Sequence, residues 1–328
     1  MSYFINYIRV LATILITNSH YSLVWPSSSM AFGGLLGNIL FFAASGFCLY
    51  KIKENFPKWF AKMFFRIYPA MIVFTLVAVA FNKYDLCNVD DFVRLFVYPT
   101  NYPFLVYLMI SYVVFYLLAW LDKKHNKTIE ASLLAVVIFW IIIYLTFVDK
   151  STYHVDDVTN PFILFLYFTS MLLGATFKKY THRYNHIKWY NVVLLFVSLI
   201  VYFASKFAFS KWQSIAQLQI LNQFSIILSL YFVFAVFIGL EKYLQQFGKI
   251  INGTIKFIAN ITLQIYIVQF LIIYKFQHLV FPLNFFVVTC LILVSASLLY
   301  YAEFFVRKGI GVLIKRIKRK ENHAESSN

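Results

Sequence analysis

Charged residues are scarce in this sequence of 328 residues, since only 13% are Asp, Glu, Lys or Arg, whereas soluble domains carry about 25%. Hydrophobic residues make up 61% and aromatic residues 21%. One soluble core could not bury so much apolar surface. The shortage of charge therefore excludes a soluble globular domain and predicts an integral membrane protein.

Acidic residues are rarer than basic ones, because 13 Asp and Glu against 29 Lys and Arg give a formal net charge of +16. In a soluble protein this excess would suggest nucleic-acid binding. In a polytopic membrane protein, however, basic residues gather in the cytoplasmic connections. We therefore expect no nucleic-acid partner and attribute the net charge to membrane topology.

Cysteine is also rare, and its three positions, Cys48, Cys87 and Cys290, lie far apart. This spacing indicates neither a disulfide framework nor a metal site. A cleavable signal peptide is not expected either, because the first apolar stretch contains Arg9 and lacks a small-residue cleavage site. We interpret that stretch as the first membrane helix.

Long apolar runs are what the sequence has in abundance, and a membrane-spanning helix needs roughly 20 such residues. The runs cover residues 4–24, 32–50, 67–81, 104–121, 129–148, 161–177, 189–208, 218–240, 257–274 and 285–305. The third run is short, but Pro57 and the amphipathic stretch 58–66 allow its helix to start early. The pattern predicts an all-α, polytopic bundle of about ten transmembrane helices.

The connections between the runs alternate in charge. If the N-terminus is cytoplasmic, every inside segment is net basic, and these segments are 51–66, 122–127, 178–188, 241–256 and the tail from Arg307. The positive-inside rule then places both termini in the cytoplasm. We predict a membrane domain over residues 1–308 and a basic, polar cytoplasmic tail over 309–328. Residues 315–328 are expected to fray and to lie against anionic lipid.

Ionisable groups inside spanning helices are costly and usually mark function. Arg9 and His20 lie eleven positions apart, which puts them within about 20° of one helix face and about 16 Å apart along the axis. Imidazole exchanges a proton near neutral pH, and guanidinium binds phosphate or carboxylate. The pair predicts a base with a handle for an anionic substrate, and the alternative is a histidine that only makes an interhelical hydrogen bond.

Two further segments stand out. Residues 41–47 read FFAASGF, and small residues in the middle of an apolar helix permit close packing of helices. Lys58, Lys62 and Arg66 recur at intervals of four and form a basic stripe at the membrane interface. This stripe indicates either snorkelling to lipid headgroups or docking of a polyphosphate.

Taken together, these motifs resemble the acyltransferase 3 family of bacterial membrane O-acyltransferases. The residues that carry the resemblance are Arg9 and His20, FFAASGF at 41–47, FRIYP at 65–69, NITLQIYIVQ at 260–269, and Glu303. The match covers nearly the whole chain. It implies transfer of an acyl group, usually acetyl from cytoplasmic acetyl-CoA, to a hydroxyl of a cell-surface polysaccharide or its lipid-linked precursor in the bacterial cytoplasmic membrane.

The resemblance also implies roles for individual residues. The functional pair of the family corresponds to His20 and Arg9, which makes them the predicted catalytic residues. The basic residues before the third helix of the family correspond to Arg66 and Lys62, and Lys58 is a further candidate for binding acyl-CoA. Acetyl-CoA is then a co-substrate, and we expect no permanently bound cofactor and no metal.

The sequence departs from the family pattern at two positions. Gln269 stands where many members have a histidine, and an amide cannot act as a base. Met63 stands where many members have a second arginine, which leaves Lys62 or Lys58 to supply the positive charge. Neither departure affects the predicted catalytic pair.

The direction of the reaction follows from the predicted topology. The CoA phosphates would dock on the cytoplasmic side, the acceptor would approach from outside, and His20 would act as the general base. Asn18, Ser45 and Gly46 are candidates for stabilising the oxyanion or for packing. The expected partners are membrane lipid, acyl-CoA, and a glycan or lipid-linked glycan acceptor.

Two other classes of protein fit part of this pattern. A transporter or flippase for a lipid-linked glycan would also need Arg and His inside its cavity. It would move the glycan without adding an acyl group. A non-catalytic membrane scaffold is the third interpretation, and the alignment of Arg9 with His20 disfavours it.

Overall fold

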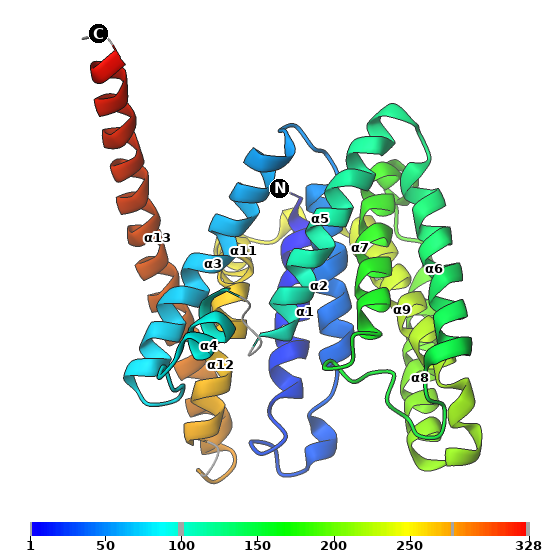
Figure 1. Ribbon diagram of the computed structural model, residues 1–328. Coiled ribbons are helices and arrows are strands. Elements are labelled where there is room, and N and C mark those ends of the chain that lie inside the picture. The colour runs from blue at the N-terminus through cyan, green and yellow to red at the C-terminus, as the bar shows by residue number, and fades with distance from the viewer. Residues whose placement is uncertain (1, 98–101, 277–278, 326–328) are drawn as a thin grey trace. The chain divides into compact units, whose positions relative to one another are not determined.

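The computed structural model describes residues 2–97, 102–276 and 279–325, with the backbone alone for 310–325. Within these ranges every regular element is a helix (Figure 1), which confirms the predicted all-α class. Each of the ten apolar runs overlaps a helix, and the run 257–274 overlaps two. The α-helices are α1 (Tyr3–Ser19), α2 (Gly34–Leu49), α3 (Phe56–Ala80), α4 (Val89–Phe92), α5 (Pro103–Lys124), α6 (Thr128–Phe147), α7 (Ile163–Lys179), α8 (Trp189–Lys211), α9 (Ile220–Gly239), α10 (Glu241–Gln246), α11 (Lys249–Asn260), α12 (Thr262–Phe276) and α13 (Leu283–Glu325). Short turns of other helix types are η1 (Ser28–Met30), η2 (Val93–Val97), η3 (Thr181–Tyr184) and η4 (Gln213–Leu218).

Several of these helices are long and apolar enough to cross a membrane. By length and composition there are 7 such helices among the described residues, or up to 8 if α11 and α12 form a single broken span. α1 and α7 have 17 residues each, which corresponds to about 26 Å, slightly less than a hydrocarbon core of about 30 Å. The chain is therefore a multi-pass membrane protein, and the count of ten spans stays a prediction.

The helices are grouped into two compact units, each assembled from segments that are far apart in the sequence. The first unit contains Met1–Ser19, Ala31–Glu54 and Thr100–Asn260. The second unit contains His20–Met30, Asn55–Pro99 and Ile261–Asn328. The predicted boundary at residue 308 falls inside the second unit, where α13 continues without a break.

The core of the first unit is built around the close approach of α2 and α7. A Cβ atom at Gly46 would lie 1.9 Å from the carbonyl oxygen of Met171, and one at Gly174 would lie 1.9 Å from that of Ala43. Only glycine allows two helix backbones to come this near. The small residues of the FFAASGF segment therefore serve helix packing, as one interpretation of the motif predicted.

A polar network joins four helix ends in the first unit. The ammonium of Lys179 lies 3.1 Å from the carboxylate of Asp122 and 3.0 Å from that of Glu130. The Tyr50 hydroxyl donates to Asp122 at 2.6 Å, and the Tyr180 hydroxyl donates to Glu130 at 2.5 Å. The hydrogen bond to the Glu130 carboxylate raises the pKa of the Tyr180 hydroxyl. The buried charges are paired and hydrogen-bonded, as burial requires.

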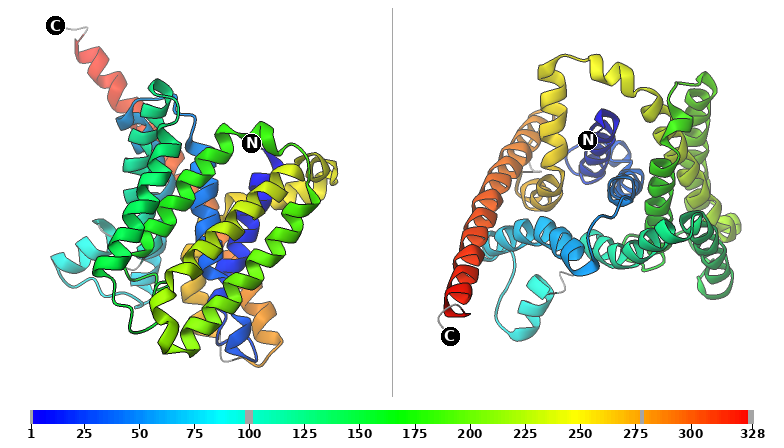
Figure 2. Two further views of the ribbon diagram at one scale, coloured as in Figure 1. Left: turned by 90° about the vertical axis from the view of Figure 1, so that its right-hand side faces the viewer. Right: turned by 90° about the horizontal axis from the view of Figure 1, so that it is seen from above.

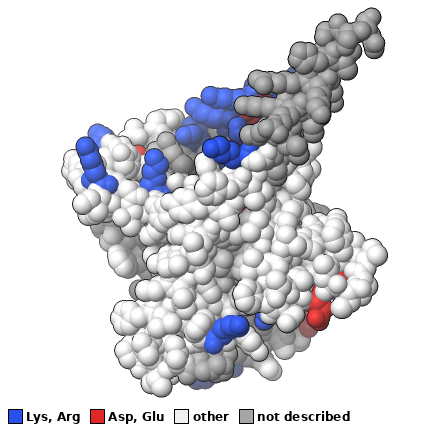
Figure 3. All heavy atoms as spheres, turned by 90° about the vertical axis from the view of Figure 1, so that its left-hand side faces the viewer, with Lys and Arg blue, Asp and Glu red and all other residues white. Residues whose placement is uncertain are grey.

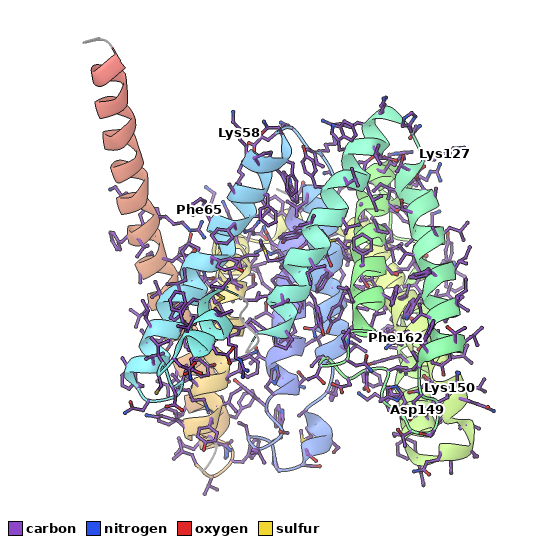
Figure 4. All side chains as sticks on the ribbon, in the orientation of Figure 1. Lys58, Phe65, Lys127, Asp149, Lys150 and Phe162 are labelled. Atoms are coloured by element: carbon purple, nitrogen blue, oxygen red, sulfur yellow. The ribbon has the colours of Figure 1, made fainter. Side chains whose placement is uncertain are left out.

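The second unit contains α3, α12 and α13, which lie against one another. α3 begins at Phe56 with Pro57 in its first turn, where proline is well tolerated because its missing N–H has no intrahelical partner. This confirms the early start predicted for the third run. Figure 4 shows Lys58 near the beginning of this helix and Phe65 further along it.

Two helix boundaries differ from the sequence prediction. α1 ends at Ser19 rather than near residue 24. The Ser19 hydroxyl donates to the Ile16 carbonyl, a local hydrogen bond that competes with helix continuation, and the Asn18 amide donates to the Phe32 carbonyl, near the start of α2. The predicted run 257–274 is interrupted at Ile261, between α11 and α12. The flanking Asn260 and Thr262 are weak helix formers.

The C-terminal segment also differs from its prediction. We expected residues 315–328 to fray, but α13 continues as one helix to Glu325 (Figure 1). The side chains of the predicted lipid-binding cluster lie outside the described residues. Its contact with anionic lipid therefore stays a prediction.

Candidate active site

The start of α1 is anchored by two neighbouring helices. The backbone N–H groups of Tyr3 and Phe4 donate to the carboxylate of Glu241 on α10, at 3.0 and 2.7 Å. The Tyr7 hydroxyl donates to the amide oxygen of Asn252 on α11 at 3.0 Å. An acidic group at a helix N-terminus pairs with unpartnered N–H groups and complements the helix dipole. These contacts, with α10 and α11 beside α1 in Figure 2, hold the helix that carries the predicted arginine.

Arg9 is buried in the apolar interior of the first unit, where only 7% of its surface is exposed. Asn6 and Thr13, three residues before and four residues after it, are buried on the same side of the helix. The Thr13 hydroxyl donates to the Arg9 carbonyl at 2.9 Å. A buried guanidinium is costly unless it is compensated, so this polar stripe is a candidate functional feature.

The end of α1 is tied to the start of α2. The Asn18 amide donates to the Phe32 carbonyl at 3.1 Å, and a Cβ atom at Gly34 would lie 2.4 Å from the Ser19 hydroxyl oxygen. Asn18 therefore holds a connection within the first unit, as Gly46 serves the packing of α2. An oxyanion role for Asn18, Ser45 or Gly46 stays a prediction.

His20 follows α1 directly and belongs to the second unit. Because α1 ends at Ser19, the helical projection that placed His20 on the face of Arg9 does not extend to it. The half-buried imidazole packs edge to face on the ring of Phe270, with centroids 4.7 Å apart. The next residue is fastened to α13, since the Tyr21 and Thr289 hydroxyl oxygens lie 3.0 Å apart. The imidazole therefore has a defined place against α12.

Gln269 precedes Phe270 on α12 and is fully buried. It is therefore adjacent in sequence to the residue that packs on the candidate base. Its amide can donate and accept hydrogen bonds but cannot take up a proton. Gln269 thus offers no second base beside Phe270, and a general-base role for His20 stays a prediction.

The basic stripe lies on one face of α3, where Lys58, Lys62 and Arg66 are all exposed. The opposite face of the same turns is packed inside the second unit, through Trp59, Met63 and Ile67. Figure 3 shows that Lys and Arg side chains gather in places on a face that is otherwise mostly uncharged. A polyphosphate or an anionic headgroup can reach such a surface from solvent.

One charged cluster was not predicted from the sequence. The carboxylate of Glu303 forms an ion pair with Arg307, and the guanidinium of Arg307 donates to the backbone carbonyl of Arg66 at 2.9 Å. The only sequence signal is the spacing of four between Glu303 and Arg307, which favours an ion pair on one helix face. The contact with α3 joins residues 241 positions apart, and no local pattern predicts it.

The fold and these residues define a multi-pass membrane protein with ionisable groups in its interior. The family model described as an acyltransferase domain, acyltransferase 3, matches residues 2–302. The chain belongs to the acyltransferase 3 family and is a membrane acyltransferase. Membership of this family favours acyl transfer over transport of a glycan. No match was found among curated proteins or among solved structures.

Proposed function

We propose that this protein is an O-acetyltransferase of the bacterial cytoplasmic membrane. It transfers an acetyl group from cytoplasmic acetyl-CoA to a hydroxyl of a cell-surface polysaccharide or of its lipid-linked precursor. The observation that carries the proposal is an arginine buried in the first helix of an acyltransferase domain, with a half-buried histidine directly after that helix. Such groups are retained in an apolar protein when they serve function.

In the proposed reaction, the acceptor hydroxyl oxygen forms a bond to the thioester carbonyl carbon of acetyl-CoA. His20 takes the hydroxyl proton as the general base. The carbon–sulfur bond then breaks, and the proton passes from His20 to the thiolate of CoA. The products are the O-acetyl ester and free CoA, so atoms and charge balance without a further reactant.

The acetyl donor would be held by positive charge. The exposed stripe of Lys58, Lys62 and Arg66 is suited to the phosphates of CoA, because Lys and Arg both form charge-assisted hydrogen bonds to phosphate. Arg9, buried on α1, would bind an anionic part of a substrate within the first unit. The acceptor glycan would approach from the side of the membrane opposite the donor.

Replacement of His20 by Ala tests the proposed base. Acetylation of the surface polysaccharide is followed by mass spectrometry in membranes that contain normal amounts of the protein. The expected loss is about 10²- to 10⁴-fold, as for removal of a general base. His154→Ala, in the connection before α7, is the matched control and should leave acetylation unchanged. Undiminished acetylation in His20→Ala would disprove the assignment.

Comparison of a deletion strain with its parent separates the proposed enzyme from a transporter. Loss of an acetyl group from a polysaccharide that still reaches the surface supports O-acetyl transfer. A smaller amount of polysaccharide at the surface, with unchanged acetylation of that polysaccharide, would support glycan translocation instead.

A further inference from the structure

The second unit contains a charged cluster formed by three helices. Glu303 of α13 is only 2% exposed, and its carboxylate accepts a hydrogen bond of 2.6 Å from the amide of Gln264 on α12. The other carboxylate oxygen forms an ion pair with Arg307, one turn further along α13. A buried carboxylate is stable only when it is paired and hydrogen-bonded. Glu303 therefore fixes the position of the Arg307 guanidinium.

Arg307 is also held by the backbone of α3. Its Nη2 atom donates to the carbonyl oxygen of Arg66 at 2.9 Å. Pro69 lies three residues further along this helix. A proline inside a helix removes one backbone hydrogen bond and disturbs the turn before it. The contact brings the Arg307 guanidinium beside Arg66 at this turn.

The cluster carries more positive than negative charge. Arg307 donates to the backbone carbonyl of Arg66, so two arginines meet at this point of α3, and the carboxylate of Glu303 is paired with Arg307. Lys62, one turn before Arg66, is exposed and adds a further positive charge. The Arg307 side chain is 40% exposed, so an anion from solution or from the membrane surface can reach it.

The donors that remain define the kind of anion. Among the described residues, Arg307 donates to Glu303 and to the Arg66 carbonyl through Nη2, whereas a guanidinium carries five N–H donors in a planar fork. Arg66, whose backbone the Arg307 guanidinium contacts, adds a second set of donors, and two arginines match an anion with several acceptor oxygens and more than one negative charge. Phosphate has this chemistry, and Arg binds it through two parallel hydrogen bonds.

We propose that Arg66 and Arg307 together form a phosphate-binding site, in which Glu303 is the positioning residue for Arg307. The phosphate would come from the acyl-CoA donor, and that choice rests on the proposed function. The headgroup of an anionic phospholipid offers the same chemistry. The test therefore has one arm for each source.

Both arms use the full-length protein in lipid nanodiscs. In the first arm, binding of coenzyme A is measured by calorimetry in phosphatidylcholine nanodiscs. In the second arm, native mass spectrometry counts the phosphatidylglycerol molecules retained. Arg307→Gln should weaken phosphate binding about tenfold or more, as expected for loss of a hydrogen bond between charged groups. Arg307→Lys keeps the charge without the fork and should be intermediate. Lys308→Gln, the exposed neighbour on the same helix, should bind like the wild type.

The role of Glu303 requires a double-mutant cycle, because Arg307→Gln leaves a buried carboxylate without its cation and could unfold the protein. The double variant Glu303→Gln with Arg307→Gln removes both charges and should show the same weakened affinity as Arg307→Gln. If Glu303 acts only through Arg307, Glu303→Gln weakens binding in the wild type and has no further effect in the Arg307→Gln background. Additive losses would overturn its positioning role.

The outcomes separate the site from its ligand. Loss of coenzyme A affinity in Arg307→Gln supports the site and identifies the acyl donor as the source of the phosphate. If the wild type binds no coenzyme A but loses phosphatidylglycerol in this variant, the phosphate site stands and the proposed donor is wrong. Unchanged binding in both arms would overturn the proposal.

Discussion

Gly46 of α2 lies so close to α7 that a Cβ atom at this position would be 1.9 Å from the carbonyl oxygen of Met171. The relation is reciprocal, because Gly174 of α7 meets the backbone of α2 in the same way. A backbone oxygen cannot move aside as a flexible side chain can. This pair of glycines therefore determines how near α2 and α7 can pack.

Replacement of Gly46 by Ala should destabilise the protein. The added methyl group forces the helices apart, and overpacking of a core costs typically about 1–3 kcal/mol. Thermal unfolding in detergent should show a lower midpoint than the wild type. The control is Gly253→Ala on α11, where no atom lies within 4 Å of the added Cβ and alanine is the better helix former. Equal midpoints for both variants would show that the close contact is absent.

Lys179 should be essential for the stability of the first unit. Replacement by Met leaves the buried carboxylate of Asp122 without its cation, and removal of one partner of a buried ion pair costs about 3–5 kcal/mol. Glu130→Gln should cost less, because its side chain is 28% exposed. The measurement is the unfolding midpoint in detergent, with Lys124→Met at the exposed end of α5 as the control. A wild-type midpoint for Lys179→Met would contradict the buried ion pair.

Acyl transfer should be sensitive to a replacement of Arg9 that keeps its positive charge. Replacement by Lys preserves the positive charge but removes the planar fork of donors, so acyl transfer should fall about tenfold or more. Arg183→Lys, the same replacement at an exposed arginine of η3, is the matched control and should leave acyl transfer unchanged. Transfer rates are compared in membranes with equal amounts of each variant. Full activity in Arg9→Lys would show that charge alone is required.

The predicted orientation can be tested through Cys87, which is exposed in a connection expected outside the membrane. In a variant with Cys48→Ser and Cys290→Ser, an impermeant maleimide should label Cys87 in intact cells. His125→Cys, placed in the connection between α5 and α6 in a background without other cysteines, should be labelled only after the cells are permeabilised. The reverse pattern would invert the predicted topology and place both termini outside.

Helix positions were largely predictable because they depend on local properties of the chain. Apolar runs of sufficient length coincide with α5, α6, α8 and α9 within a few residues. Pro57 correctly indicated the early start of α3, since proline favours the first turn of a helix. The ends of α1 and α11 were less predictable. There, a local hydrogen bond of the Ser19 side chain or weak helix formers compete with an apolar pattern that continues past them.

The candidate site was predictable only in part. Arg9 and His20 attract attention in any apolar sequence, because charged groups in a membrane are costly. Arg307 does not stand out in the sequence, because a basic residue near the end of a spanning helix usually snorkels to the interface. Its proposed role depends on the ion pair with Glu303 and on the hydrogen bond to the Arg66 carbonyl, which only the tertiary structure shows.

Composition and the order of apolar and polar residues predicted an all-helical membrane protein, and the resemblance of its motifs to a known family indicated the family and the residues most worth testing. Folding established which of these residues meet. It paired Asp122 with Lys179, brought Gly46 against Met171, and ended α1 before His20. The physical reason is that hydrophobicity and helix propensity act over a few residues. Ion pairs and close backbone contacts instead join segments that are far apart in the sequence, and no local sequence pattern predicts them.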